Sequence, residues 1–121
     1  MLTIENNKHS IYLDDEKTKI LATEIANSIS SSFGKRYKKM FDMDNGYLTY
    51  DNTQELEQLI DRDKYKEILY FLYGIKYHGS LSKINCELFQ SLLNKQDKPI
   101  LNEFKKLIDE CVENDEYLRW Y

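Results

Sequence analysis

The densest apolar pattern of the chain runs from residue 63 to residue 79, DKYKEILYFLYGIKYHG. Aliphatic side chains recur there three or four positions apart, and aromatic side chains fill the other faces of the same helix. A helix that is apolar around most of its circumference packs against neighbours on several sides. We therefore predict a central helix over residues 64–77, the most buried of the fold, which stops before Gly79.

Four further segments repeat apolar side chains at helical spacing, and Asp, Ser, Gly or Pro residues typical of helix ends lie between them. These segments cover residues 14–33, 53–60, 82–93 and 99–114. Because the connections are short, neighbouring helices are expected to pack against each other in antiparallel pairs. The sequence predicts a mainly α fold of about five helices, a single helical domain over residues 1–121.

Two stretches could add a short β-hairpin to this helical fold. Residues 2–4 and 10–13 read as extended pieces around a polar turn, although a loop that packs Ile4, Ile11 and Leu13 onto the domain is the alternative. The sequence Asp44–Asn45–Gly46 is a strong turn signal. It predicts a second hairpin, or an ordered aromatic loop, within residues 37–50.

Composition narrows the class of protein. The 121 residues carry a formal net charge of −4 and a pI of about 5.2, whereas general nucleic-acid-binding domains are usually basic. No apolar run reaches the roughly 20 residues that cross a bilayer, and the first residues lack the pattern of a secretion signal. Cys86 and Cys111 lie on apolar helix faces, as buried free thiols do. We expect a cytoplasmic protein that does not bind membranes.

The candidate chemical motifs fail on spacing. In Asp42–Met43–Asp44–Asn45–Gly46, an EF-hand register would place Phe41 and Met43 at calcium-ligand positions, so a turn is the better interpretation. His9 and His78 have no metal-ligand or nucleophile partners at suitable spacing. The sequence also contains no glycine-rich phosphate loop. We therefore expect no catalytic residues, no metal, no cofactor and no small-molecule substrate.

Charge is the remaining signal. The last thirteen residues contain five acids and three aromatic side chains, and residues 51–63 form a second acidic stretch that contains only one base. Aromatic residues frequently anchor protein interfaces. An acidic surface helix could equally be ordinary solvated structure, and the terminal aromatics could instead dock onto the core. The residues that we predict to contact a basic protein partner are Glu55, Glu57, Asp61, Asp109, Glu110, Glu113, Asp115, Glu116, Tyr117, Trp120 and Tyr121.

This combination resembles bacterial toxin-immunity proteins, specifically the immunity proteins of contact-dependent growth inhibition systems. The resemblance is carried by YKEILYFLYGIKYHG, ELFQSLLNK and the DECVENDEYLRWY end. It implies an intracellular protein that binds one cognate toxin, commonly a nuclease with a basic cleft, and blocks its active site.

Two other functions stay open on the sequence. A phage-encoded inhibitor of a host nuclease or defence complex would use the same acidic surface. A small nucleic-acid-binding regulator would instead use the one dense basic cluster, which contains Lys35, Arg36, Lys38 and Lys39. The acidic balance of the chain argues against nucleic acid as its partner.

Overall fold

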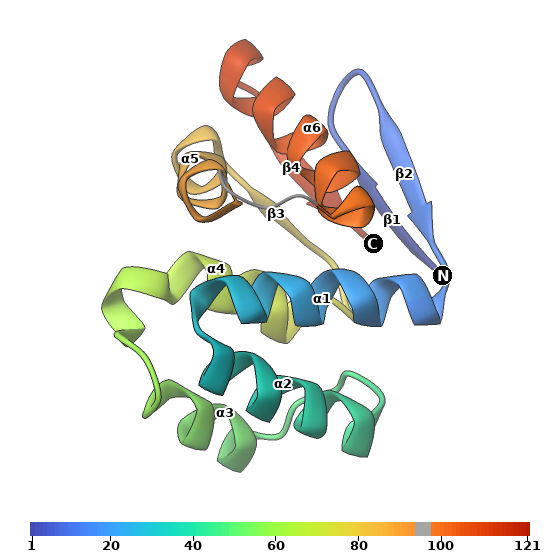
Figure 1. Ribbon diagram of the computed structural model, residues 1–121. Coiled ribbons are helices and arrows are strands. Elements are labelled where there is room, and N and C mark those ends of the chain that lie inside the picture. Colours follow the sequence, from blue (N-terminus) through green and yellow to red (C-terminus); the bar gives the residue numbers. More distant parts are fainter. Residues whose placement is uncertain (94–97) are drawn as a thin grey trace.

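A computed structural model describes residues 1–93 and 98–121, which form six helices and four short strands (Figure 1). The fold is mainly α, as the sequence predicts. In chain order the elements are β1 Leu2–Glu5, β2 Ser10–Leu13, α1 Asp15–Ile29, α2 Ser31–Asp44, α3 Tyr50–Glu57, α4 Arg62–Gly74, β3 Gly79–Leu81, α5 Lys83–Leu93, α6 Pro99–Asn114 and β4 Leu118–Trp120.

The four strands form one antiparallel sheet in the order β2-β1-β4-β3. The predicted N-terminal hairpin is confirmed, with Leu2 opposite Leu13 and Glu5 opposite Ser10. The last strand, β4, lies between β1 and β3, and the amide and carbonyl groups of Thr3 and Tyr121 pair with each other beyond the end of β4. The two chain ends therefore lie close together, as Figure 1 shows.

Helices α1, α4, α5 and α6 cover one face of this sheet, whereas α2 and α3 form a further layer beyond α1 (Figure 1). The core fills the space between the sheet and the helices and continues between the helix layers. Alternate strand residues point inward and are fully or almost fully buried, namely Leu2, Ile4, Leu13, Leu81, Leu118 and Trp120. Aromatic rings from α4, α5 and α6 meet them: Phe71 lies with its ring centroid 4.9 Å from Trp120, 5.5 Å from Phe89 and 5.3 Å from Phe104. These ring contacts therefore connect strand β4 to helices α4, α5 and α6.

The predicted central helix corresponds to α4, but it is shorter and less buried than we expected. It ends at Gly74, earlier than the predicted end at residue 77. Residues 79–81, which we expected to connect two helices, form strand β3. Ile68, Leu69, Phe71 and Leu72 are buried, whereas the side chain of Tyr70 is 49% exposed. The prediction that this helix is the most buried of the fold was therefore wrong, because the buried residues of α4 lie on one side of it and α1 contains more of them.

The predicted helix over residues 14–33 is in fact two helices, separated at Ser30. Ser30 ends α1 and caps α2, because its extended backbone breaks the helix and its Oγ accepts a hydrogen bond of 3.1 Å from the amide of Phe33. Gly34 lies inside α2 and does not stop a helix. A Cβ at Gly34 would be 1.7 Å from Oδ1 of Asn27, so glycine is needed there to let α1 and α2 pack closely.

The predicted hairpin within residues 37–50 is wrong, because α2 continues through Asp44. Tyr37 and Phe41 stand one turn apart and are both buried, a spacing that a helix satisfies. The turn signal marks the end of this helix. Asn45 has φ 52° and Gly46 has φ 87°, and the Gly46 amide donates a 2.9 Å hydrogen bond to the carbonyl oxygen of Phe41.

Cys86 on α5 and Cys111 on α6 are free and buried, as their positions on apolar stripes predicted. Within residues 1–93 and 98–121, none of the helices has the length and apolarity that crossing a membrane requires.

Candidate protein-binding surface

Several residues of the predicted contact surface gather at the carboxyl end of α6 and just after it. We call Glu113, Asp115, Glu116 and Tyr117 the acidic end of α6. Asp115 has a left-handed backbone with φ 53°, and the amides of Asp115 and Glu116 both donate to the carbonyl oxygen of Cys111. This turn redirects the chain into β4 and leaves Glu113, Asp115 and Tyr117 exposed.

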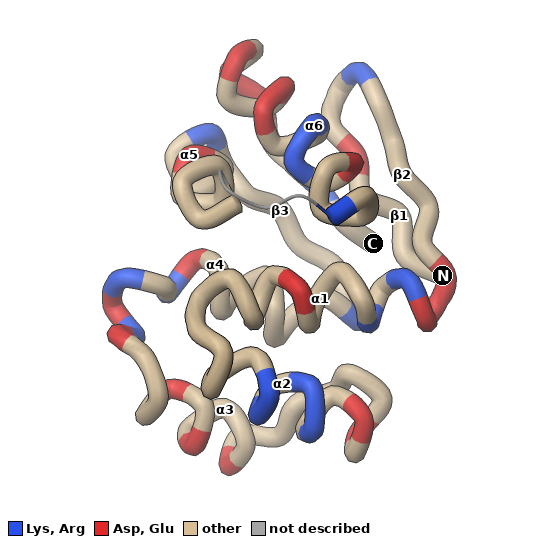
Figure 2. Tube along the Cα trace, viewed as in Figure 1, with Lys and Arg blue, Asp and Glu red and all other residues tan. Residues whose placement is uncertain are grey.

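These acids lie where the helix itself disfavours negative charge. The carboxyl end of an α-helix carries a partial negative charge, which favours cations and repels anions. The last turn of α6 contains no basic residue, and the far end of the helix in Figure 2 is marked by acids. Repulsion between the acids and the helix dipole therefore costs stability at this end.

Glu116 adds a second feature to the acidic end. Among the described residues, its Oε1 is buried and has no hydrogen-bond partner. A buried oxygen without a partner costs free energy, because the hydrogen bond to water is lost and not replaced. The residue as a whole is half-buried between the exposed Asp115 and Tyr117.

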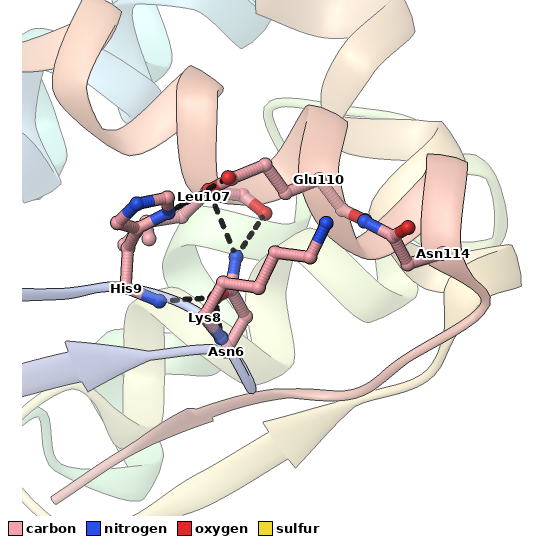
Figure 3. A network of polar contacts seen from close by, with 6 residues as sticks. All are labelled: Asn6, Lys8, His9, Leu107, Glu110 and Asn114. Atoms are coloured by element: carbon pink, nitrogen blue, oxygen red, sulfur yellow. Dashed lines mark hydrogen bonds and ion pairs between the residues drawn. The ribbon is translucent and has the colours of Figure 1, made fainter.

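A polar network holds the β1–β2 turn against α6, next to these acids (Figure 3). The side chain of Asn6 is buried, with 3% exposure, and every polar atom of it is used. Its Oδ1 accepts hydrogen bonds of 2.8 Å from the amides of Lys8 and His9. Its Nδ2 donates bonds of 3.2 Å to the Leu107 carbonyl oxygen and to Oε1 of Glu110. Asn6 thus fixes the hairpin to the helix.

Glu110 belongs to this network, although we predicted it as a partner contact. Nδ1 of His9 lies 2.9 Å from Oε1 and 2.7 Å from Oε2 of the Glu110 carboxylate. Burial of this carboxyl opposes its ionisation, but the hydrogen bonds from His9 and Asn6 outweigh that effect, so the pKa of Glu110 is below its usual value. Glu110 is therefore committed to holding the hairpin in place.

The other residues predicted on α6 and β4 do not join the acidic end. Oδ1 of Asp109 accepts a 2.8 Å hydrogen bond from Gln90 on α5. Trp120 is 1% exposed and is a core residue, so the alternative that it docks inward holds. Tyr121 is 60% exposed on the sheet face away from the helices, where its hydroxyl donates to Glu5.

The second predicted acidic stretch is separate from the first. It lies on and after α3, at the opposite end of the molecule from the end of α6 (Figure 2). The three acids of this stretch that we predicted as contacts already have partners: Glu55 pairs with Arg36, Glu57 accepts a 3.1 Å hydrogen bond from Arg62, and Asp61 caps α4. The predicted residues therefore do not form one continuous surface, and those of α3 are largely neutralised.

Nothing in the sequence indicates the role of Asn6 and His9, since a polar turn is the ordinary place for both residue types. Only the fold brings this turn to α6, about a hundred positions away along the chain.

Within the described residues, no group of three or more His, Cys, Asp or Glu side chains is arranged to hold a metal ion. Comparison with known proteins found no matching family model, no matching curated protein and no matching solved structure.

Proposed function

We propose that this chain is a binding protein of the toxin-immunity kind, which neutralises a basic protein toxin by covering its substrate-binding surface with the acidic end of α6. The observation that carries the proposal is the position of Glu113, Asp115 and Glu116. They stand at the helix end that electrostatics disfavours, beside an exposed tyrosine and without a base in the last turn. Natural proteins commonly give up stability at surfaces that are used for function.

Neutralisation of this kind requires no chemistry in the inhibitor. Carboxylates take the place of substrate phosphates beside the partner's Lys and Arg side chains, and long-range attraction speeds the encounter. Tyr117, with 57% exposure, supplies an aromatic surface that slows dissociation.

A phage-encoded inhibitor of a host nuclease would bind through the same surface by the same physics. Gene neighbourhood separates the two functions. A toxin gene directly beside this one supports an immunity protein, whereas a phage cassette supports the inhibitor.

Affinity capture from the native organism would supply the partner, and binding kinetics would then test the surface. The double variant Glu113→Lys/Asp115→Lys should associate about tenfold more slowly, with a weaker dependence on salt. Glu87→Lys/Glu103→Lys is the matched control, because it makes the same charge change at exposed acids of α5 and α6 outside the acidic end. Tyr117→Ala should mainly shorten the lifetime of the complex.

Parent-like kinetics for both the Glu113→Lys/Asp115→Lys variant and Tyr117→Ala would exclude the acidic end as the contact surface. An equal slowing of association by the control pair would show that only the overall charge of the protein matters.

A further inference from the structure

A second surface lies along the line of contact between α2 and α3, at the other end of the molecule from the acidic end of α6. We call it the α2–α3 seam. Two recesses of about 490 and 210 Å³ follow it, and both are lined by Arg36, Lys39 and Glu55. The shared lining residues make the two recesses neighbours along one groove. The other lining residues are Ser32, Lys35, Met40, Met43, Asn52 and Leu59.

The α2 side of the seam is a ridge of cations produced by helical spacing. Lys39 follows Arg36 by three positions and Lys35 by four, so all three cations lie on one side of α2. Arg36 reaches across the seam and pairs with Glu55 of α3. Lys35 and Lys39 are exposed, and neither has a carboxylate partner among the described residues. Three cations thus face a single acid among the side chains that line the recesses.

The seam also contains exposed apolar side chains, which a purely ionic binding site does not require. Leu59 lines one recess and is 44% exposed, and Met43 lines the other and is 67% exposed. Each is a large apolar side chain in contact with solvent beside a lysine. A ligand that covers both groups needs carboxylates and apolar side chains in one short segment.

We propose that the α2–α3 seam binds an acidic amphipathic segment of a protein partner. Carboxylates of the segment pair with Lys35 and Lys39 and compete with Glu55 for Arg36, while its apolar side chains cover Leu59 and Met43. Charge complementarity selects an acidic occupant. This surface is distinct from the acidic end of α6, and the proposal for it does not depend on the proposed function.

The observations favour a protein segment over nucleic acid. No aromatic ring lines either recess, whereas proteins that bind single strands generally stack bases on aromatic side chains. The exposed aliphatic groups match apolar side chains of a peptide better than they match bases.

The test uses the whole protein and a fluorescein-labelled helical peptide that presents Glu on one face and Leu on the other. Fluorescence anisotropy at low salt measures its affinity, and a labelled oligothymidylate strand is the second probe. Lys35→Glu/Lys39→Glu should weaken peptide binding by about tenfold. Lys17→Glu/Lys66→Glu, the same charge change at exposed lysines of α1 and α4, should leave most of the affinity intact. Leu59→Ser should weaken binding about threefold without disturbing the fold.

Several outcomes would overturn the proposal. These are no binding of the acidic peptide by the parent protein, an equal loss in the two double variants, or no effect of Leu59→Ser. Binding of the oligothymidylate strand but not the peptide, lost in Lys35→Glu/Lys39→Glu, would assign the seam to nucleic acid instead.

Discussion

The indole Nε1 of Trp120 donates a 2.9 Å hydrogen bond to the carbonyl oxygen of Gly74. This bond joins the last strand, β4, to the end of α4, forty-six positions earlier in the chain. The same indole lies against Gly79, the first residue of β3, and its ring contacts Phe71 in the core. A residue next to the chain end thus helps to fix how the sheet sits on the helices.

The first prediction follows from the contact between this indole and Gly79. A Cβ at Gly79 would lie 2.4 Å from Cζ2 of Trp120, which is closer than two carbon atoms can approach. Gly79→Ala should therefore displace the indole and lower the free energy of unfolding by about 2 kcal/mol. Urea unfolding, followed by tryptophan fluorescence, measures the loss.

Gly74→Ala is the matched control. Its Cβ would lie 3.8 Å from the same indole, an ordinary contact, and the backbone of Gly74 suits any residue. This variant should gain up to about 1 kcal/mol, because alanine favours the helix. A Gly79→Ala protein as stable as the parent would show that the indole moves without cost.

The sequence predicted the elements that depend on local pattern. The N-terminal hairpin follows from two extended pieces and a polar turn, and the helices follow from apolar spacing. Strands β3 and β4 were missed because each contains three residues, too few to show a period of two. They exist because β4 pairs with β1, whose residues lie more than a hundred positions away.

Other errors came from residues that have more than one structural use. Gly34 was read as a helix stop and Gly46 as part of a hairpin turn, but Gly34 allows two helices to approach and Gly46 ends a helix. The acids of the candidate surface were found from composition alone. The sequence did not show that Glu55 and Glu110 already have partners, because Arg36 and His9 lie 19 and 101 positions away from them.

The second prediction concerns the two thiols, which should be reduced and inert in the native protein. Cys86 and Cys111 are buried on facing sides of α5 and α6. The neighbouring Cys111 thiol and burial raise the pKa of the Cys86 thiol, whereas the neighbouring Cys86 thiol lowers the pKa of Cys111. Burial of both side chains, which keeps the reagent away from the sulfur atoms, is therefore the common reason for their inertness. Both thiols should react with a colour-forming disulfide reagent only on global unfolding, at rates that rise together with urea. Rapid labelling without denaturant, or a bridge between the two cysteines in mass spectra, would contradict this.

The third prediction concerns the His9–Glu110 contact and low pH. Hydrogen bonds in the folded state place the pKa of Glu110 below its ordinary value of 4.5. The folded state therefore favours the ionised carboxylate, and the resulting stability is present above about pH 4.5. It is lost as the pH falls through the lowered pKa of the folded protein.

Glu110→Gln should therefore be less stable than the parent by about 1 kcal/mol at pH 7. The difference should shrink steadily as the pH falls below 4.5, because the parent then also loses its carboxylate. Urea midpoints at a series of pH values measure this. Glu113→Gln is the control, since Glu113 is exposed and makes no hydrogen bond within the described residues. A Glu110→Gln difference that is constant with pH would show that the contact carries no charge-dependent stability.

The last prediction joins the stability of the acidic end of α6 to its proposed use. Glu113 lies in the last turn of α6, where a negative charge opposes the helix dipole and the turn itself contains no basic residue. Glu113→Lys should therefore raise the free energy of unfolding by about 0.5 kcal/mol, and high salt should reduce the gain. Glu103→Lys, in the amino-terminal part of the same helix, should give no such gain, because negative charge is not disfavoured there. If Glu113→Lys is no more stable than the parent, the acids at this end are not costly, and their position ceases to support a binding function. A more stable variant that also associates more slowly with the partner would show that this surface gives up stability for recognition.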